Sequence, residues 1–151
     1  MRLWHVAVVS GLACALLPGL SPAAEVKRKG SIELSQAWAR SKPGDAKTAT
    51  AYVKISNLGE DADRFESAVT PVAERVELKD SGTLGGGVRI RDDGGMEVPP
   101  GTTTEMKPGS LHFVLSSVNQ PLRVGAQFPI VLFFEKAGPI RIDVDVREPA
   151  L

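Results

Sequence analysis

FPIVLFF at residues 128–134 and IRIDVDVR at residues 140–147 are the two stretches that decide the fold class of this chain. In the second stretch, apolar side chains alternate with charged ones, which is the period of a β-strand with one buried face. In the first stretch, alternation brings apolar side chains to both faces, which is typical of a strand in the middle of a sheet. The two stretches therefore predict two β-strands, the first of them central.

The rest of the chain has the same character. Glycine and proline recur about every eight to twelve residues and separate short runs with strand patterning, and no window holds the period of a long helix. About eight or nine short strands with such turns predict an all-β fold, an antiparallel β-sandwich. The other strands are expected near residues 32–38, 51–55, 64–69, 74–79, 87–91, 102–106 and 111–118.

The N-terminal residues 1–24 have the pattern of a secretory signal peptide. A positive start and an apolar run that ends at Leu20 are followed by SPAA at 21–24, whose small residues suit a signal peptidase. A membrane span is the alternative interpretation, but the run is marginal in length and prolines break its end. We therefore expect cleavage of the leader and export of residues 25–151, as one domain, to the bacterial periplasm with no stable membrane anchor.

Charge and cysteine content exclude several classes of function. The chain has 18 Lys plus Arg and 18 Asp plus Glu, so loss of Arg2 with the leader leaves 17 against 18 and a net charge of −1. Nucleic acids and anionic membranes attract basic surfaces, so neither is an expected partner. The single cysteine, Cys14, follows a poor match to a lipoprotein signal and is lost with the leader. This loss excludes disulfides, thiolate metal sites and cysteine catalysis in the mature chain.

The sequence also lacks a complete set of catalytic residues. His112 is the only histidine outside the leader, and Ser110 shares its predicted strand face, but no third group or oxyanion arrangement accompanies them. We therefore expect a protein that is not an enzyme. The acidic pair Asp92-Asp93 and the acidic residues within 60–63 have oxygen ligands for a hard cation, but near glycines they are more simply turn formers.

Two further segments are assigned a structural role only. The glycine-rich stretch 82–87 lacks the following helix and the Lys-Ser/Thr pair of a phosphate-binding loop, so it predicts a hairpin turn. Residues 25–29 carry three cations, so they predict a solvated tail.

A series of short motifs runs in a fixed order through nearly the whole mature chain. This series resembles the periplasmic copper chaperone family PCu(A)C. The resemblance implies a cupredoxin-like β-sandwich, a choice among sandwiches that the strand count alone does not make. The motifs are AWAR at 37–40, AY at 51–52 with Asn57, VEL at 76–78, PPG at 99–101, KPG at 107–109 and the run PGSLHFVL at 108–115.

In that family, a His, a Met and a His-x-Met pair bind Cu(I). When His112 is aligned with the second histidine, Lys79, Ile90 and Val114 occupy the other three positions. These four residues are called the ligand frame below. The resemblance thus implies a divergent member that retains one copper ligand, His112, and has lost the other three. No residue is therefore assigned as a metal ligand, and no cofactor is expected.

The side chains of the ligand frame suit Cu(I) poorly. Strand alternation puts His112 and Val114 on one face, opposite to Phe113. Cu(I) is soft and favours thioether and imidazole donors, whereas Ile90 and Val114 offer no lone pair and the Lys79 ammonium can only donate. A pair of like unit charges about 4 Å apart costs on the order of 4 kcal/mol at an effective dielectric of 20. We therefore expect that the frame does not bind copper in the family manner.

A copper site of a different kind is the alternative. His112 could bind copper weakly together with Met96 or Met106, or with ligands shared across a dimer. The simpler interpretation makes His112 a half-exposed strand histidine hydrogen-bonded to a neighbour, and makes both methionines fillers of apolar gaps. In that interpretation, Lys79 is a solvated lysine beside Glu77.

The resemblance also implies a physiological setting. Members of the family serve copper enzymes of the cell envelope, which places this chain in copper homeostasis. The expected function is an exported PCu(A)C-like protein that keeps the sandwich in order to bind another envelope protein involved in copper handling.

Overall fold

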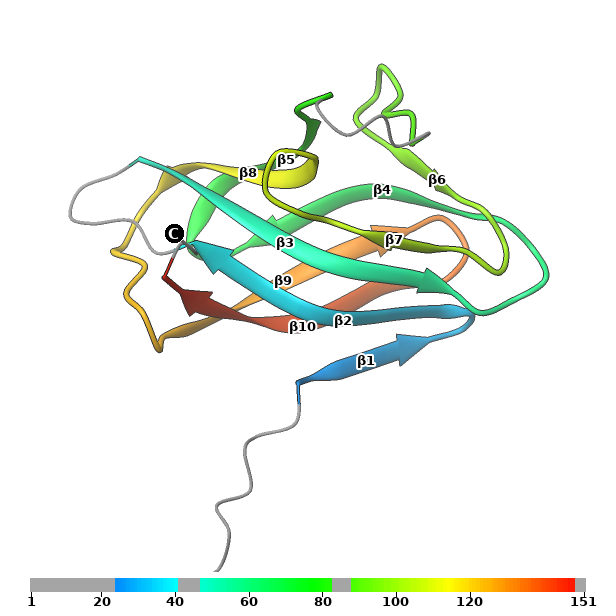
Figure 1. Ribbon diagram of the computed structural model, residues 1–151, viewed down its shortest axis with the longest axis horizontal. Coiled ribbons are helices and arrows are strands. Elements are labelled where there is room, and N and C mark those ends of the chain that lie inside the picture. Colours follow the sequence, from blue (N-terminus) through cyan, green and yellow to red (C-terminus); the bar gives the residue numbers. More distant parts are fainter. Residues whose placement is uncertain (1–23, 41–46, 83–87, 149–151) are drawn as a thin grey trace, which may run out of the picture.

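The computed structural model describes residues 24–40, 47–82 and 88–148, and every regular element in these ranges is a β-strand (Figure 1). The predicted all-β class is thus confirmed, with ten strands in place of eight or nine. The strands are β1 (Val26–Lys29), β2 (Ile32–Arg40), β3 (Thr48–Asn57), β4 (Asp63–Thr70), β5 (Ala73–Asp80), β6 (Met96–Val98), β7 (Thr103–Glu105), β8 (Leu111–Val118), β9 (Gln127–Phe134) and β10 (Gly138–Arg147).

Seven of these strands form a closed wall. The order around the wall is β2, β10, β9, β4, β5, β8 and β3, and β3 pairs again with β2. All pairings in this ring are antiparallel except that of β2 with β10, which run parallel with Trp38 opposite Asp145. The short strands β1, β6 and β7 are added to β2, β4 and β3. The result is a sandwich whose two sheets are joined at their edges.

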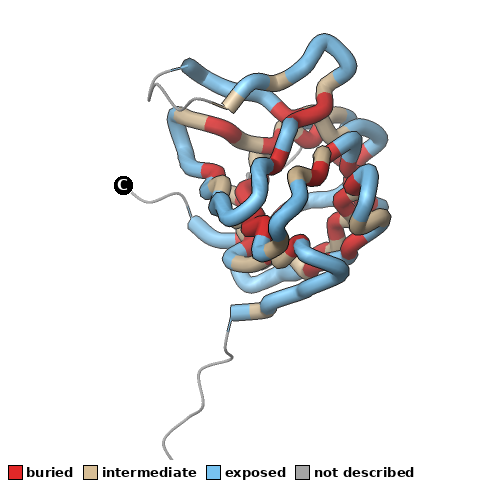
Figure 2. The backbone as a smooth tube through the Cα atoms, turned by 90° about the vertical axis from the view of Figure 1, so that its right-hand side faces the viewer, coloured by how far each residue is buried: buried red, intermediate tan, exposed pale blue. Residues whose placement is uncertain are grey.

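The core fills the space inside this wall, where Figure 2 shows the buried residues gathered. Phe65 lies at its centre, with its ring centroid 5.6 Å from that of Phe113 and 6.0 Å from that of Phe134. Full burial of a large apolar side chain stabilises the fold by about 1.5–3 kcal/mol. The core therefore holds the strands in the register that positions the candidate site.

The two strands that decide the fold class behave as the sequence predicts. β9 lies between β4 and β10, so it is central, and Phe128, Ile130, Leu132 and Phe134 are buried. Its other face points outward and is only half-buried, because a closed wall has a single interior. On β10 the alternate residues Ile140, Ile142, Val144 and Val146 are buried, which confirms the half-buried strand.

The expectation of a strand near residues 87–91 is wrong for the part that the structure describes. Arg91 N donates to Gly95 O at 2.8 Å, and this turn folds the chain back so that Ile90 forms an isolated bridge with Met96. The strand of this region is β6, which begins after the turn. The turn residues Asp92, Asp93 and Gly94 carry the strong turn signal, and they end the extended run that Val88 and Ile90 suggest.

The expectation of a solvated tail at residues 25–29 is also wrong. Val26 to Lys29 form β1 and pair with β2, from Val26 opposite Ser35 to Lys29 opposite Ile32. All four side chains of β1 are exposed, so the strand is held through backbone atoms and leaves no alternation in the sequence. Pattern reasoning depends on a buried face, and β1 has none.

The expected signal peptide lies outside the described residues except for Ala24, and so does Cys14. The described part of the chain contains no helix long and apolar enough to span a bilayer.

Candidate functional site

The pairing of β5 with β8 places two positions of the ligand frame opposite each other across the sheet. Lys79 is opposite His112, and Glu77 is opposite Val114. Residues that are directly opposite in an antiparallel pair point to the same face. The neighbouring pair of Leu78 and Phe113 is buried, so Glu77, Lys79, His112 and Val114 all lie on the outer face of the wall.

His112 is half-buried, and its ring has one backbone partner. Nδ1 lies 2.7 Å from the carbonyl oxygen of Ser110. A carbonyl oxygen can only accept, so Nδ1 carries the proton and donates it, and in the neutral ring Nε2 keeps the lone pair. This arrangement is the hydrogen-bonded strand histidine that the sequence suggested. The Ser110 group that His112 contacts is the backbone carbonyl.

Lys79 lies beside the imidazole as a surface cation. Its Nζ is 3.8 Å from Glu77 Oε1, and the two side chains are 55% and 42% exposed, so the interaction is weak. The expected location of Lys79 beside Glu77 on one face is thus confirmed. The imidazole of His112 has an ammonium side chain as its cross-strand neighbour, where the family frame would have a second histidine.

Ile90, the fourth position of the frame, lines the same open groove as Lys79. The groove has a volume of about 510 Å³, and it is called the β5 groove below. The turn that carries Ile90 is fixed by an ion pair of 2.7 Å between Arg64 Nη2 and Asp93 Oδ2. The lining residues are Phe65, Glu66, Ser67, Val76, Glu77, Leu78, Lys79, Asp80, Ile90, Arg91, Asp92, Asp93 and Gly94.

Asp93 remains ionised in this turn. The hydrogen bond from the backbone N–H of Gly95 lowers the pKa of the Asp93 carboxyl below its ordinary value, and the positive charges of Arg64 and Arg91 lower it further. Asp93 is thus engaged by its own turn, which agrees with the expected role of the Asp92-Asp93 pair as turn formers.

Met96 and Met106 are both enclosed in the core, with exposed fractions of 0% and 3%. Met96 pairs with Phe65 on β4, while His112 lies on the outer face of the wall. The thioethers are therefore packed as apolar groups, which is the simpler of the two interpretations that the sequence allowed.

Asp63 has a role that sequence reasoning missed. This buried carboxylate accepts hydrogen bonds from the backbone N–H groups of Arg64 at 2.7 Å, Lys136 at 2.9 Å and Ala137 at 3.0 Å. It thereby joins the start of β4 to the turn between β9 and β10. No local signal could have identified this role, because two of the partners are more than seventy residues away along the chain.

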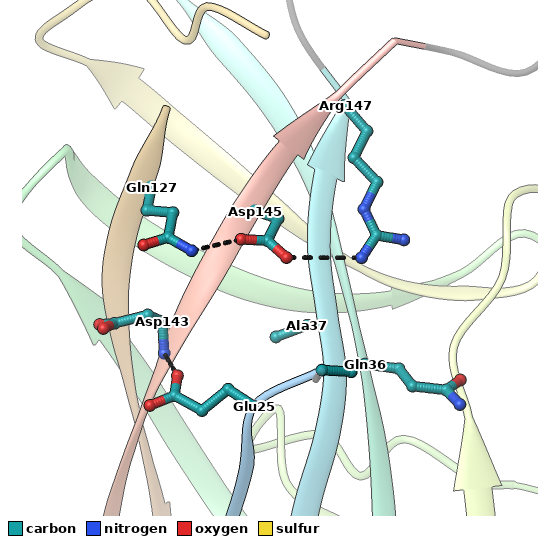
Figure 3. A pocket seen from close by; sticks show the side chains of 8 residues that line it. Glu25, Gln36, Ala37, Gln127, Asp143, Asp145 and Arg147 are labelled. Atoms are coloured by element: carbon teal, nitrogen blue, oxygen red, sulfur yellow. Dashed lines mark hydrogen bonds and ion pairs between the residues drawn. The ribbon is translucent and has the colours of Figure 1, made fainter. Parts of the chain in front are cut away.

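A second opening lies on the opposite part of the wall, where β2 exchanges β1 for β10 as its neighbour (Figure 3). It is called the β1 pocket and has a volume of about 300 Å³. Glu25 reaches into it, and Glu25 Oε2 accepts a hydrogen bond of 2.8 Å from the backbone N–H of Asp143. The lining residues are Ala24, Glu25, Gln36, Ala37, Gln127, Asp143, Asp145 and Arg147.

The charges in the β1 pocket are locally paired. Lys27 Nζ lies 2.7 Å from Glu25 Oε1, and Gln127 Nε2 donates to Asp145 Oδ1 at 2.6 Å. The hydrogen bond with Lys27, followed by that from the backbone of Asp143, lowers the pKa of Glu25 below its ordinary value. In the described ranges, no group of three or more His, Cys, Asp or Glu side chains could hold a metal ion, here or elsewhere.

Comparisons with known proteins agree with this architecture. Residues 32–146 match the model of the LpqE-like lipoprotein family. Among curated proteins, none matches this chain in sequence. Among solved structures, the chain is similar to the copper-bound PCuAC domain from PmoF2, with 25% identity over 83% of this chain and 99% of that chain and a TM-score of 0.72.

Two further structures share the fold. The apo PCuAC domain from PmoF1 is 23% identical over 83% of this chain and 100% of that chain, with a TM-score of 0.71. The solution structure of Cu(I)-DR1885 from Deinococcus radiodurans is 22% identical over 74% of this chain and 75% of that chain, with a TM-score of 0.54. The sandwich is therefore cupredoxin-like, as the resemblance implied.

The family match spans β2 to β10 and includes all four positions of the ligand frame. The fold, the strand order and the match in sequence lead to the same assignment. The chain therefore belongs to the LpqE-like family and is a PCuAC-type domain.

Proposed function

We propose that this chain is an exported PCuAC-type protein of the copper-handling setting that does not bind Cu(I) in the family manner and acts by binding another envelope protein. The single observation that supports the proposal most is the cross-strand pairing of Lys79 with His112. It puts a cation beside the one imidazole that the ligand frame retains. The role is non-catalytic.

The donor set of the frame supports the same proposal. Val114 and Ile90 are aliphatic, so Nε2 of His112 is the one soft donor that the frame offers. Cu(I) needs several thioether or imidazole donors for tight binding. Repulsion between Cu(I) and the Lys79 ammonium opposes binding by up to about 4 kcal/mol at a separation near 4 Å, reduced by solvent because Lys79 is exposed.

An active copper carrier with a remodelled site is the second candidate. The favouring observation is the hydrogen bond from Nδ1 of His112 to Ser110 O, because metal-binding histidines usually donate their other ring N–H in this way. The burial of Met96 and Met106 argues against either one as the second ligand unless the core opens. Ligands shared across a dimer are compatible with the outward position of His112.

Copper titration separates the two candidates. The mature chain is titrated with Cu(I) in competition with a chromophoric chelator, and with Cu(II) in a separate series. We expect retention of less than about a tenth of an equivalent per chain, because one imidazole cannot compete with a chelator that has several donors. Near-stoichiometric retention that is abolished by His112→Ala would overturn the proposal in favour of a remodelled site.

Export is tested by the mass of the mature protein. Cleavage after Ala23 or Ala24 in a bacterial host gives a soluble periplasmic chain without Cys14. The family is described as one of lipoproteins, and a lipid-modified N-terminus at Cys14 would instead retain the chain on a membrane. Intact-mass measurement of the fractionated protein distinguishes these results, and a membrane-bound, lipid-modified product would contradict the expected cleavage.

A further inference from the structure

The edge of β5 that faces away from β8 has no strand beside it over its second half. β5 pairs with β8 along its whole length, from Ala73 to Asp80. On the other side it pairs with β4 only from Ala73 to Val76. Within the described ranges, no strand continues this pairing beyond Val76.

The backbone direction along this edge follows from one hydrogen bond. Ser81 N donates to Ser110 O across the β5–β8 pair. Hydrogen-bonded pairs alternate along an antiparallel ladder, so Lys79 and Glu77 also turn their backbone groups toward β8. The backbone N–H and C=O groups of Leu78 and Asp80 therefore point the other way, into the β5 groove, which both residues line.

The opening has a cause in β4. The register of β4 with β9 shifts between Phe65 and Ser67, which leaves Glu66 as the extra residue of a β-bulge. Beyond the bulge, β4 pairs with β6 instead of β5, from Phe65 opposite Met96 to Asp63 opposite Val98. β4 and β5 thus diverge at Glu66, and the β5 groove fills the angle between them.

The groove has the chemistry of a peptide site. Its apolar lining is formed by Phe65, Val76, Leu78 and Ile90, whereas its charged lining is mostly acidic. Asp93 is paired with Arg64 and Glu77 with Lys79. The five carboxylates Glu66, Glu77, Asp80, Asp92 and Asp93 face the two cations Lys79 and Arg91 in the lining, so the groove has an excess of negative charge.

We propose that the β5 groove binds an extended, cationic segment of the partner protein as an added strand on β5. Leu78 and Asp80 supply the backbone donors and acceptors, as in other cases of β-strand addition. Alternate side chains of the segment point toward the apolar lining and toward the carboxylates, which selects lysine or arginine in the polar positions. This inference rests on the proposed interaction role and names the surface and the chemistry of the partner.

A set of small peptides tests the inference on the mature chain. The probe is a fluorescent hexapeptide of alternating lysine and valine with blocked ends. The first comparison peptide has glutamate in place of lysine, and the second has methylated nitrogens at alternate backbone amides. We expect the probe to bind at low salt and to shift the amide NMR signals of Leu78 and Asp80. Both comparison peptides should bind at least about tenfold more weakly.

Charge reversal in the groove provides the protein side of the test. Glu66→Lys combined with Asp92→Lys should weaken binding of the lysine–valine probe at least about tenfold. Glu135→Lys combined with Glu148→Lys is the matched control, because both carboxylates are exposed and lie outside the β5 groove. The control should change the affinity less than about twofold, since screening weakens distant charges.

Three results would overturn the inference: no shift at Leu78 and Asp80, equal binding of the methylated peptide, or equal loss of binding in the control variant. The copper titration remains a separate test. If the lysine–valine peptide does not bind and the chain retains no copper, the β5 groove is rejected as the binding surface, but the proposed function still stands. If the chain retains near-stoichiometric copper and the peptide binds as expected, the proposed function is rejected and the β5 groove stands as a peptide-binding surface.

Discussion

Neighbouring strands of the wall diverge at two places, the β1 pocket and the β5 groove. The strand edge is covered by side chains at the first and open at the second. At the β1 pocket, β10 diverges from β2, so part of the edge of β10 has no strand beside it. Side chains of β1 and of Glu25, which precedes β1, cover that edge. Glu25 accepts from Asp143 N at 2.8 Å, and Lys29 Nζ donates to Pro139 O at 3.2 Å. At the β5 groove, β4 leaves β5, and the backbone groups of Leu78 and Asp80 face the groove with no strand of the described part beside them.

The difference shows that an exposed strand edge is not a necessary result of this topology. Unpaired edges invite association with other chains, and proteins usually cover them. This chain covers one edge with charged side chains and leaves the other open next to Lys79 and Ile90, two positions of the ligand frame. The open edge of β5 is therefore the part of the wall that best fits the proposed binding of a partner protein.

The largest expected effect comes from restoring copper ligands around the open groove. Lys79→His, Ile90→Met and Val114→Met together should create a Cu(I) site with His112. Removal of the ammonium relieves a repulsion that solvent screens because Lys79 is exposed, and the thioethers add soft donors. Together these changes should raise the affinity for Cu(I) by at least about tenfold. Competition with a chromophoric chelator measures the gain.

The matched control for that triple variant keeps the ammonium and changes only the aliphatic positions, Ile90→Met with Val114→Met. It should gain much less affinity than the triple variant. If the triple variant gains nothing, the four positions do not converge as a ligand set, and the alignment that defines the frame has the wrong register.

The next largest effect is expected at Asp63, which holds β4 on the side away from β5. Asp63→Ala leaves the N–H groups of Lys136 and Ala137 without their acceptor. The free energy of unfolding should fall by about 3 kcal/mol, since hydrogen bonds to charged groups contribute roughly 1.5–3 kcal/mol each. Urea unfolding measures the change, and Asp61→Ala is the exposed control. A loss below about 1 kcal/mol would show that Asp63 does not hold β4 in place.

Hydrogen exchange compares the two edges directly. The amide protons of Leu78 and Asp80 should exchange at least about tenfold faster than those of Glu77 and Lys79, which point toward β8. The amide proton of Asp143, covered by Glu25, should exchange slowly. Equal protection of all four β5 amides in the free mature chain would mean that the edge is already covered, and the comparison between the two openings would fail.

Local sequence patterns were sufficient to predict which residues share a face of a strand, but not which strands pair with one another. Alternation predicted that His112 and Phe113 lie on opposite faces of their strand, and this is confirmed because a period of two is a property of the strand itself. The meeting of Lys79 with His112 was implied by family spacing and not by either segment alone. β1 was missed because it has no buried face. β6 was missed because the run that includes Val88 and Ile90 was expected to be the strand of this region.

Long-range polar contacts lay beyond any pattern in the sequence. Glu25 and Asp143 are 118 positions apart, and their hydrogen bond joins a side chain to a backbone group that any residue other than proline would supply. The β5 groove depends in turn on a bulge at Glu66, which changes the partner of β4. Such features follow from how strands diverge in the closed wall, which local propensity does not determine.

The smallest expected effect tests the covered edge. Glu25→Gln removes the charge that Lys27 and the Asp143 N–H stabilise, and the unfolding free energy near pH 7 should fall by about 1 kcal/mol, a modest value because the side chain is partly exposed. The pKa of Glu25 is lowered in the folded state from 4.5. Its stabilising contribution is therefore fully present above that value and is lost as the pH falls through the lower, folded-state pKa.

The pH profile therefore separates a covered edge from a simple loss of surface charge. Below the folded-state pKa of Glu25, the mature chain and the Glu25→Gln variant should have nearly equal stability, whereas above pH 5 the variant should be weaker. Glu135→Gln is the control for the loss of one surface charge, since Glu135 is exposed. If the two variants have the same profile, Glu25 does not cover β10. Both edges of the wall would then be open, and an uncovered edge alone could no longer identify β5 as the binding surface.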